Sequence, residues 1–166
     1  DFTGVPVAEL KHHFQIKAAE TIVSTTTILG TADEVLRRLR QSGYKMAIAT
    51  TKIRPHVDGI IKRFGWQDLF DAAVGGNEVA KVKPDPEAML LALERMQAEP
   101  EDTMVVGDTE NDVLAARAVP MQVTAISSPY NGDEKLKASA PDYFIHSLEE
   151  LEVLLAKLDA SEAPDA

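Results

Sequence analysis

The stretch Gly107–Asp112 reads Gly-Asp-Thr-Glu-Asn-Asp and follows directly on the apolar run Met104–Val106. It holds two carboxylates, Asp108 and Asp112, four residues apart. Carboxylate oxygens are ligands that Mg²⁺ prefers, and the ion commonly takes one or two of them while it keeps several waters. Thr109-x-x-Asp112 is also a helix-start pattern, so Asp112 on its own fits a helix cap. The pair therefore predicts a Mg²⁺ site in which Asp112 has two open interpretations.

Two further polar positions complete this chemistry. Thr50 follows the apolar run Met46–Ala49, and Lys83 lies in Lys81–Pro86. A Thr hydroxyl with nearby backbone N–H groups can bind phosphate oxygens, and a Lys ammonium can balance the charge of a transferring phosphoryl group. Each residue alone also fits an ordinary structural role, whereas the set indicates a phosphate held beside Mg²⁺.

Composition restricts the classes of function. The chain has 166 residues, with 17 Lys+Arg against 27 Asp+Glu, and no Cys. The length suits one domain, and the net charge of −10 argues against a nucleic-acid partner. The absence of Cys excludes a disulfide scaffold, a thiolate zinc site and a Cys nucleophile. No membrane span or signal peptide is visible, so we expect a cytoplasmic protein.

Short β-rich runs alternate with helical patterns along most of the chain. This alternation predicts an α/β fold with a parallel sheet covered by helices, in which ligands bind beyond the carboxyl ends of the strands. One predicted helix, Thr31–Ser42, begins with a capping box made by Thr31 and Glu34. The predicted strands are Lys45–Thr50, Ala72–Gly75, Thr103–Gly107, Gln122–Ser127 and Asp142–Ile145.

In chain order these residues resemble three motifs of the haloacid dehalogenase (HAD) superfamily, closest to its phosphoglycolate-phosphatase-like branch. Ile48–Lys52 resembles the second motif, although Thr51 stands where an Asn usually follows the Thr. Lys83–Pro86 resembles the third motif, and Gly107–Asp112 resembles the fourth. The likeness runs from about residue 31 to residue 158, which is most of the chain.

The resemblance implies a three-layer Rossmann-like fold and a Mg²⁺-dependent phosphatase. Such an enzyme hydrolyses a small phosphorylated metabolite through an aspartyl-phosphate. Thr50 and Lys83 would be the catalytic residues, with Thr50 on the phosphoryl oxygens and Lys83 stabilising charge. These two and Thr51 would bind substrate. Asp108 would hold the metal, supported by Asp112.

The first motif of the family, an apolar strand that ends in the nucleophilic Asp, has no clear counterpart. Asp1–Gly4 is faintly similar to one variant, which makes Asp1 a weak candidate nucleophile. The favoured alignment instead treats Val5–Thr27 as the end of a helical cap. On this alignment residues 1–27 are the cap remnant or connector, 28–160 the HAD-like core, and 161–166 a disordered tail.

The strand of the first motif lies centrally in family members, so we expect a gap in the middle of the sheet. A gap of this kind leaves two rows of backbone groups unpaired, which is costly. We expect the missing strand to lie upstream, to come from another chain, or to be replaced by a rearranged strand such as Thr25–Leu29.

Other functions stay open on the sequence alone. A non-catalytic relative would bind phosphate or metal without turnover, and the missing nucleophile favours it. A phospho-receiver domain uses similar residues, but there the acidic pair comes first, whereas here Thr50 and Lys83 precede Asp108. The cap selects the substrate in this family, so the substrate and a dehalogenase or phosphonatase activity stay open. A homo-oligomer is compatible with the sequence.

Overall fold

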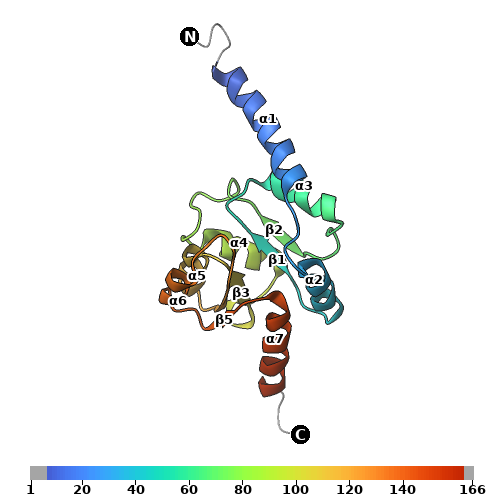
Figure 1. Cartoon of the computed structure of the whole chain (residues 1–166). Helices are drawn as coiled ribbons and strands as arrows, with labels where there is room; N and C mark the ends of the chain where they lie inside the picture. The colour runs from blue at the N-terminus through green and yellow to red at the C-terminus, as the bar shows by residue number, and fades with distance from the viewer. Residues whose placement is uncertain (1–6, 163–166) are drawn as a thin grey trace.

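The computed structural model describes residues 7–162, in which strands and helices alternate as predicted (Figure 1). The strands are β1 (Ala47–Ala49), β2 (Ala72–Val74), β3 (Met104–Gly107), β4 (Gln122–Ile126) and β5 (Tyr143–Ile145). The helices are α1 (Val7–Thr25), α2 (Ala32–Gln41), α3 (Arg54–Phe64), α4 (Glu87–Met96), α5 (Glu110–Arg117), α6 (Asp133–Ala138) and α7 (Leu148–Glu162). None of these helices is both long and apolar enough to span a membrane.

Helices cover both faces of the strands, which confirms the predicted three layers (Figure 1). On one face α4, α5 and α6 pack through a core that includes Met89, Val113 and Leu136. On the other face α2 and α7 pack through a core that includes Val35 and Leu151. Burial of these apolar side chains is the main force that holds the layers together.

The strands form two separate parallel sheets, β1–β2 and β3–β4–β5. Within residues 7–162 no strand pairing joins β1 to β3. The expected gap in the middle of the sheet is therefore confirmed. The rearranged strand proposed for Thr25–Leu29 is wrong, because α1 runs through Thr25 and the residues that follow it form no strand.

The two strands that flank the gap are more exposed than an outer strand. Every residue of β2 is buried although β2 lies at the edge of its sheet. In contrast, every residue of β1 is only partly buried, and Val106 of β3 is 38% exposed. Interior strands of a parallel sheet are normally buried on both faces, so the inner edges of β1 and β3 lack a neighbour in the described part of the chain.

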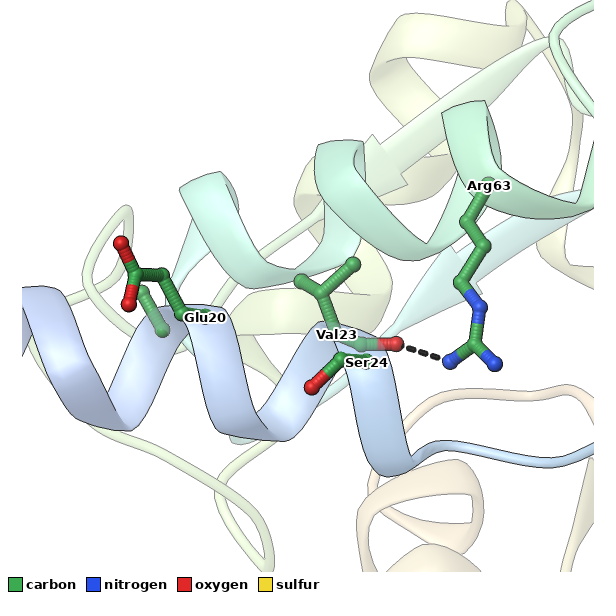
Figure 2. Close-up of a pocket in the computed structure, with 5 residues that line it drawn as sticks. Glu20, Val23, Ser24 and Arg63 are labelled. Carbon is green, nitrogen blue, oxygen red and sulfur yellow. Dashed lines mark hydrogen bonds between the residues drawn. The ribbon is translucent and has the colours of Figure 1, made fainter.

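The N-terminal helix extends away from the strands and is held to the core by its last turns (Figure 1). Val23 of α1 lies against Gly59 of α3, where an added Cβ would approach the Val23 Cγ2 to 2.7 Å. Arg63 of α3 donates to the carbonyl of Val23 (Figure 2). It also donates to the carbonyl of Thr26 at 2.8 Å. These bonds satisfy carbonyl groups that the end of a helix leaves free.

Two sequence predictions about helix ends need correction. Thr31 makes no side-chain cap on α2 and its hydroxyl donates to Glu149 of α7 instead, so the predicted capping box with Glu34 is wrong. Helix α7 continues to Glu162, two residues into the predicted tail, and residues 163–166 lie outside the described part of the chain.

Candidate active site

Lys83 lies where the carboxyl ends of the two sheets meet. Its Nζ donates to the carbonyl oxygen of Ala49, the last residue of β1, at 3.0 Å. The same Nζ donates to Asp112 Oδ1, in the first turn after β3, at 2.6 Å. The side chains of Lys83 and Asp112 are only 13% and 9% exposed, so solvent screens their attraction weakly. One buried ammonium thus joins the two halves of the fold.

Asp112 fulfils one of the two interpretations that the sequence left open, the helix cap, and in addition pairs with Lys83. Its Oδ2 accepts hydrogen bonds from Thr109 N at 3.1 Å and from Thr109 Oγ1 at 2.6 Å. This is the capping box of α5, completed by the Asp112 N–H and the Thr109 hydroxyl oxygen. Since Oδ1 holds Lys83, both oxygens of Asp112 have partners, and the carboxylate fixes the ammonium and the helix start together.

Gly107, which is buried at the end of β3, allows this close arrangement. A Cβ at this position would lie 2.3 Å from the Cβ of Asp112 and 2.7 Å from its Cγ. Contacts this short do not occur between real side chains, and neither atom is the free end of a flexible chain. The glycine before Asp108 is therefore required by packing against Asp112.

Asp108 is the carboxylate at the open end of β3. One of its oxygens, Oδ2, accepts a hydrogen bond from Asn131 Nδ2 at 3.0 Å, and its backbone carbonyl accepts from the same nitrogen at 3.2 Å. The other oxygen, Oδ1, has no hydrogen-bond donor among residues 7–162. A half-buried carboxylate with one free oxygen fits a hard cation such as Mg²⁺.

The described residues offer no metal cage made by protein side chains alone. Among the described residues no group of three or more His, Asp or Glu side chains is placed to hold a metal. Mg²⁺ needs only one or two carboxylates, with water and substrate phosphate oxygens as the other ligands.

Thr50 and Thr51 follow β1 at the same end of the strands. The Thr50 N–H donates to Val74 O at 3.0 Å, and the Thr50 Oγ1 accepts from Lys52 N at 3.3 Å. Thr50 and Lys52 line a hollow of about 210 Å³ together with Thr26, Ile48, Val57 and Ile60. Thr51 is exposed, and its carbonyl lies against Gly76, where a Cβ would approach the oxygen to 2.5 Å.

The structure thus brings some of the predicted site residues together. Lys83 and Asp112 are in direct contact, and Asp108 lies at the end of the strand that leads to Asp112. Thr50 and Thr51 follow the strand end that Lys83 contacts, while Asp1 lies outside the described residues.

Sequence reasoning missed Asn131 as a neighbour of Asp108. Asn131 lies in the loop that follows β4, between Ile126 and the start of α6. Its place just after a strand, like that of Thr50 and Asp108, is the signal in the sequence that points to it.

A second hollow, of about 560 Å³, lies between α1 and α3 and shares no residue with this site (Figure 2). It is lined by Ala19, Glu20, Val23, Ser24 and Arg63. It offers no carboxylate pair, and its single cation, Arg63, is engaged with α1 carbonyls. The cluster around Lys83, and not this hollow, is therefore kept as the candidate site.

Comparisons with known proteins agree with the motifs. The model of the haloacid dehalogenase-like hydrolase family matches residues 3–119. The chain is 33% identical to the pyrophosphatase PpaX of Bacillus mycoides over 129 residues, which is 78% of this chain and 60% of that protein. It is 27% identical to a phosphoglycolate phosphatase of Haemophilus influenzae over 92% of this chain and 68% of that protein.

Solved structures show the same fold. A predicted phosphoglycolate phosphatase from Haemophilus somnus superposes with a TM-score of 0.80 at 25% identity, over 91% of this chain and 68% of that chain. The chain spans between 55% and 61% of the length of the first pyrophosphatase relatives. Because the family model covers well over half of the sequence, the chain belongs to the haloacid dehalogenase-like hydrolases, on the branch that holds the phosphoglycolate phosphatases.

Proposed function

We propose that the protein is a Mg²⁺-dependent phosphatase that hydrolyses a small phosphorylated metabolite through an aspartyl-phosphate. The observation that carries this proposal is the contact of Lys83 with both the end of β1 and Asp112. A largely buried ammonium at the carboxyl ends of parallel strands, paired with Asp112, suits the stabilisation of a transferring phosphoryl group. The family supports hydrolysis as the class of reaction.

Each residue has a defined part in this reaction. Asp108 would hold Mg²⁺ through its free oxygen, and the ion would neutralise charge on the phosphoryl oxygens. Asp112 keeps Lys83 in place through the 2.6 Å ion pair. Lys83 stabilises charge on the attacking group and the phosphate, and Thr50 binds phosphoryl oxygens at the end of β1.

The attacking carboxylate would be carried by a strand that occupies the gap between β1 and β3. Such a strand would pair with both inner edges and end beside Lys83. A carboxylate oxygen attacks phosphorus, the bond from phosphorus to the ester oxygen breaks, and the leaving oxygen takes a proton from an acid. Water then attacks the acyl phosphate, which releases inorganic phosphate and restores the carboxylate.

The substrate is proposed to be a phosphomonoester of a small metabolite, handled in the cytoplasm. The names of the relatives suggest two compounds for a first panel, phosphoglycolate and inorganic pyrophosphate. Release of phosphate from phosphoglycolate would support the proposal, whereas turnover of pyrophosphate alone, which is a phosphoanhydride and not an ester, or a dehalogenase activity without phosphate release would contradict it.

The test uses the product of the complete reading frame, with phosphate release measured against Mg²⁺ concentration. We expect turnover that needs Mg²⁺ and that falls at least about a hundredfold in Asp108→Asn, because the variant loses the carboxylate charge. Glu110→Gln is the matched control, since Glu110 is an exposed carboxylate two residues further on. Activity of Asp108→Asn close to that of the control would reject the assignment.

A second candidate is a non-catalytic relative that binds phosphate or metal. It is favoured by one observation, because among residues 7–162 Asp112 is the sole carboxylate that contacts Lys83, and both its oxygens are engaged. Calorimetry that detects phosphate or Mg²⁺ binding by a complete protein with no turnover of the panel would support it. Turnover would exclude it.

A further inference from the structure

Asn131 is tied to Asp108 by two hydrogen bonds from one nitrogen. Its Nδ2 lies 3.0 Å from Asp108 Oδ2 and 3.2 Å from the Asp108 backbone oxygen. One amide therefore bridges the carboxylate and the main chain of the same residue. The terminal torsion of an Asp side chain is broad when nothing restrains it, and this bridge restrains it.

The loop that carries Asn131 is itself held in shape. Asn131 N donates to Ser128 O at 3.3 Å, and the two residues form an isolated antiparallel bridge. Ser127 Oγ donates to Asp133 Oδ1 at 2.8 Å across the base of the loop. Asn131 is exposed, so these bonds, and not burial, keep its amide against Asp108.

An amide is suited to this task because it is neutral. A Lys or Arg at the same place would cancel the charge of Asp108 and compete with a cation, whereas an Asn donates a hydrogen bond and leaves the negative charge intact. The bond occupies Oδ2 and leaves Oδ1 free. Outer-shell partners of this kind typically contribute tenfold or more to metal affinity.

We propose that Asn131 is a positioning residue for the metal site, which orients Asp108 so that its Oδ1 faces the cation. This inference rests on the proposed function, because it requires Asp108 to be the metal ligand. It assigns a role to the loop after β4, which none of the three sequence motifs includes.

The test measures Mn²⁺ binding by electron paramagnetic resonance, followed by competition with Mg²⁺, on the product of the complete reading frame. Asn131→Ala is expected to weaken Mn²⁺ binding by about tenfold and to raise the Mg²⁺ concentration for half-maximal activity by a similar factor. The kcat at saturating Mg²⁺ should change less than threefold. Gln122→Ala is the matched control, an exposed amide at the other end of β4.

Asp108→Asn separates the two ways in which this test can fail. If Asp108→Asn abolishes Mn²⁺ binding while Asn131→Ala binds like the control, the positioning role is wrong and the metal site stands. If Asp108→Asn binds Mn²⁺ as tightly as the unmodified protein, the metal site itself is wrong. Thermal melting of each variant distinguishes loss of affinity from loss of folding, and a tenfold effect with an unchanged melting temperature supports the proposal.

Discussion

The outer edge of β2, which faces away from β1, and the inner edges of β1 and β3, which face the gap, differ in the side chains that cover them. On the outer edge, Ala73 O accepts hydrogen bonds from Arg54 at 2.7 Å and from Arg95 at 2.6 Å. Glu78 joins the two guanidinium groups, at 3.6 Å from Arg54 and 2.9 Å from Arg95. Charged side chains on an edge strand prevent further pairing, so this side of the sheet is closed.

Among residues 7–162, the inner edges carry no arginine pair of this kind. The carbonyl of Ala49 accepts from Lys83, whose other partner is Asp112 of the candidate site. Val106 of β3 remains 38% exposed. The comparison indicates that arginines close the outer edge for stability, whereas the inner edges are left open beside the residues that would do chemistry.

The largest effect is expected from Lys83→Met, which keeps the apolar stem and removes the charge. Turnover should fall by about a thousandfold or more, because the ammonium no longer offsets phosphoryl charge. Stability should fall by about 2 kcal/mol, since Asp112 stays buried without its cation. Phosphate release and urea unfolding measure the two effects.

Lys81→Met is the control for this variant. Lys81 lies in the same loop, but its side chain is 75% exposed and it pairs with Asp85 at 3.6 Å. An exposed pair of this kind contributes little, so activity and stability should both be retained. Equal losses in the two variants would contradict a special role for Lys83.

Gly107→Ala should have the next largest effect, on folding and site together. The added Cβ would meet Asp112 at 2.3 Å, and overpacking of this kind costs about 1–3 kcal/mol. Gly132→Ala is the matched control, because nothing lies within 4 Å of its added Cβ and its φ is −76°. A melting temperature for Gly107→Ala equal to that of Gly132→Ala would disprove the packing explanation.

Arg95→Ala tests the closed outer edge and should separate stability from activity. Loss of the bonds to Ala73 O and Glu78 should reduce the free energy of unfolding by about 1–2 kcal/mol while kcat stays within twofold. Arg37→Ala removes a guanidinium that pairs with Asp33 on its own helix and should cost about 0.5 kcal/mol or less. A large fall in kcat for Arg95→Ala would contradict the claim that the outer edge serves stability and not activity.

The smallest effect is a pH dependence at Glu78. The Gly75 N–H, and after it the Arg95 guanidinium, hold the pKa of Glu78 below its usual value of 4.5. A depressed pKa adds stability that is fully present above pH 4.5 and is lost as the pH falls through the lower pKa of the folded state. Glu78→Gln should therefore be less stable than the unmodified protein at pH 7, and the difference should shrink below pH 4.5. A difference that stays constant with pH would contradict this explanation.

Local patterns predicted most of the fold. The alternation of apolar runs and helices predicted the parallel arrangement, and Lys83 and Asp112 were predicted to belong to one site. What could not be predicted depends on distant partners. The hydroxyl of Thr31 binds Glu149, more than a hundred residues away, and not the nearby Glu34. The six-residue helix α6 is too short to show a periodic pattern.

In the candidate site, too, local patterns predicted some features, while others depend on distant partners. The spacing of Thr109 and Asp112 predicted the cap, which the structure confirms. The bond of Asn131 to Asp108 joins two loops 23 residues apart. The position of Asn131 after β4 makes it a candidate, but the sequence does not predict that it contacts Asp108. Gly107 could be placed at a strand end from sequence, but its need to be glycine depends on the position of Asp112.

The most direct test of a nucleophile in the gap between β1 and β3 is to trap the covalent intermediate. The product of the complete reading frame would be mixed with substrate, quenched in acid and reduced with borohydride, which converts an aspartyl-phosphate to homoserine that mass spectrometry can locate. We expect one labelled aspartate that lies outside residues 7–162, with its label lost in Lys83→Met. Label on Asp108 or Asp112, or steady turnover with no label on any aspartate, would contradict the proposed role of the gap.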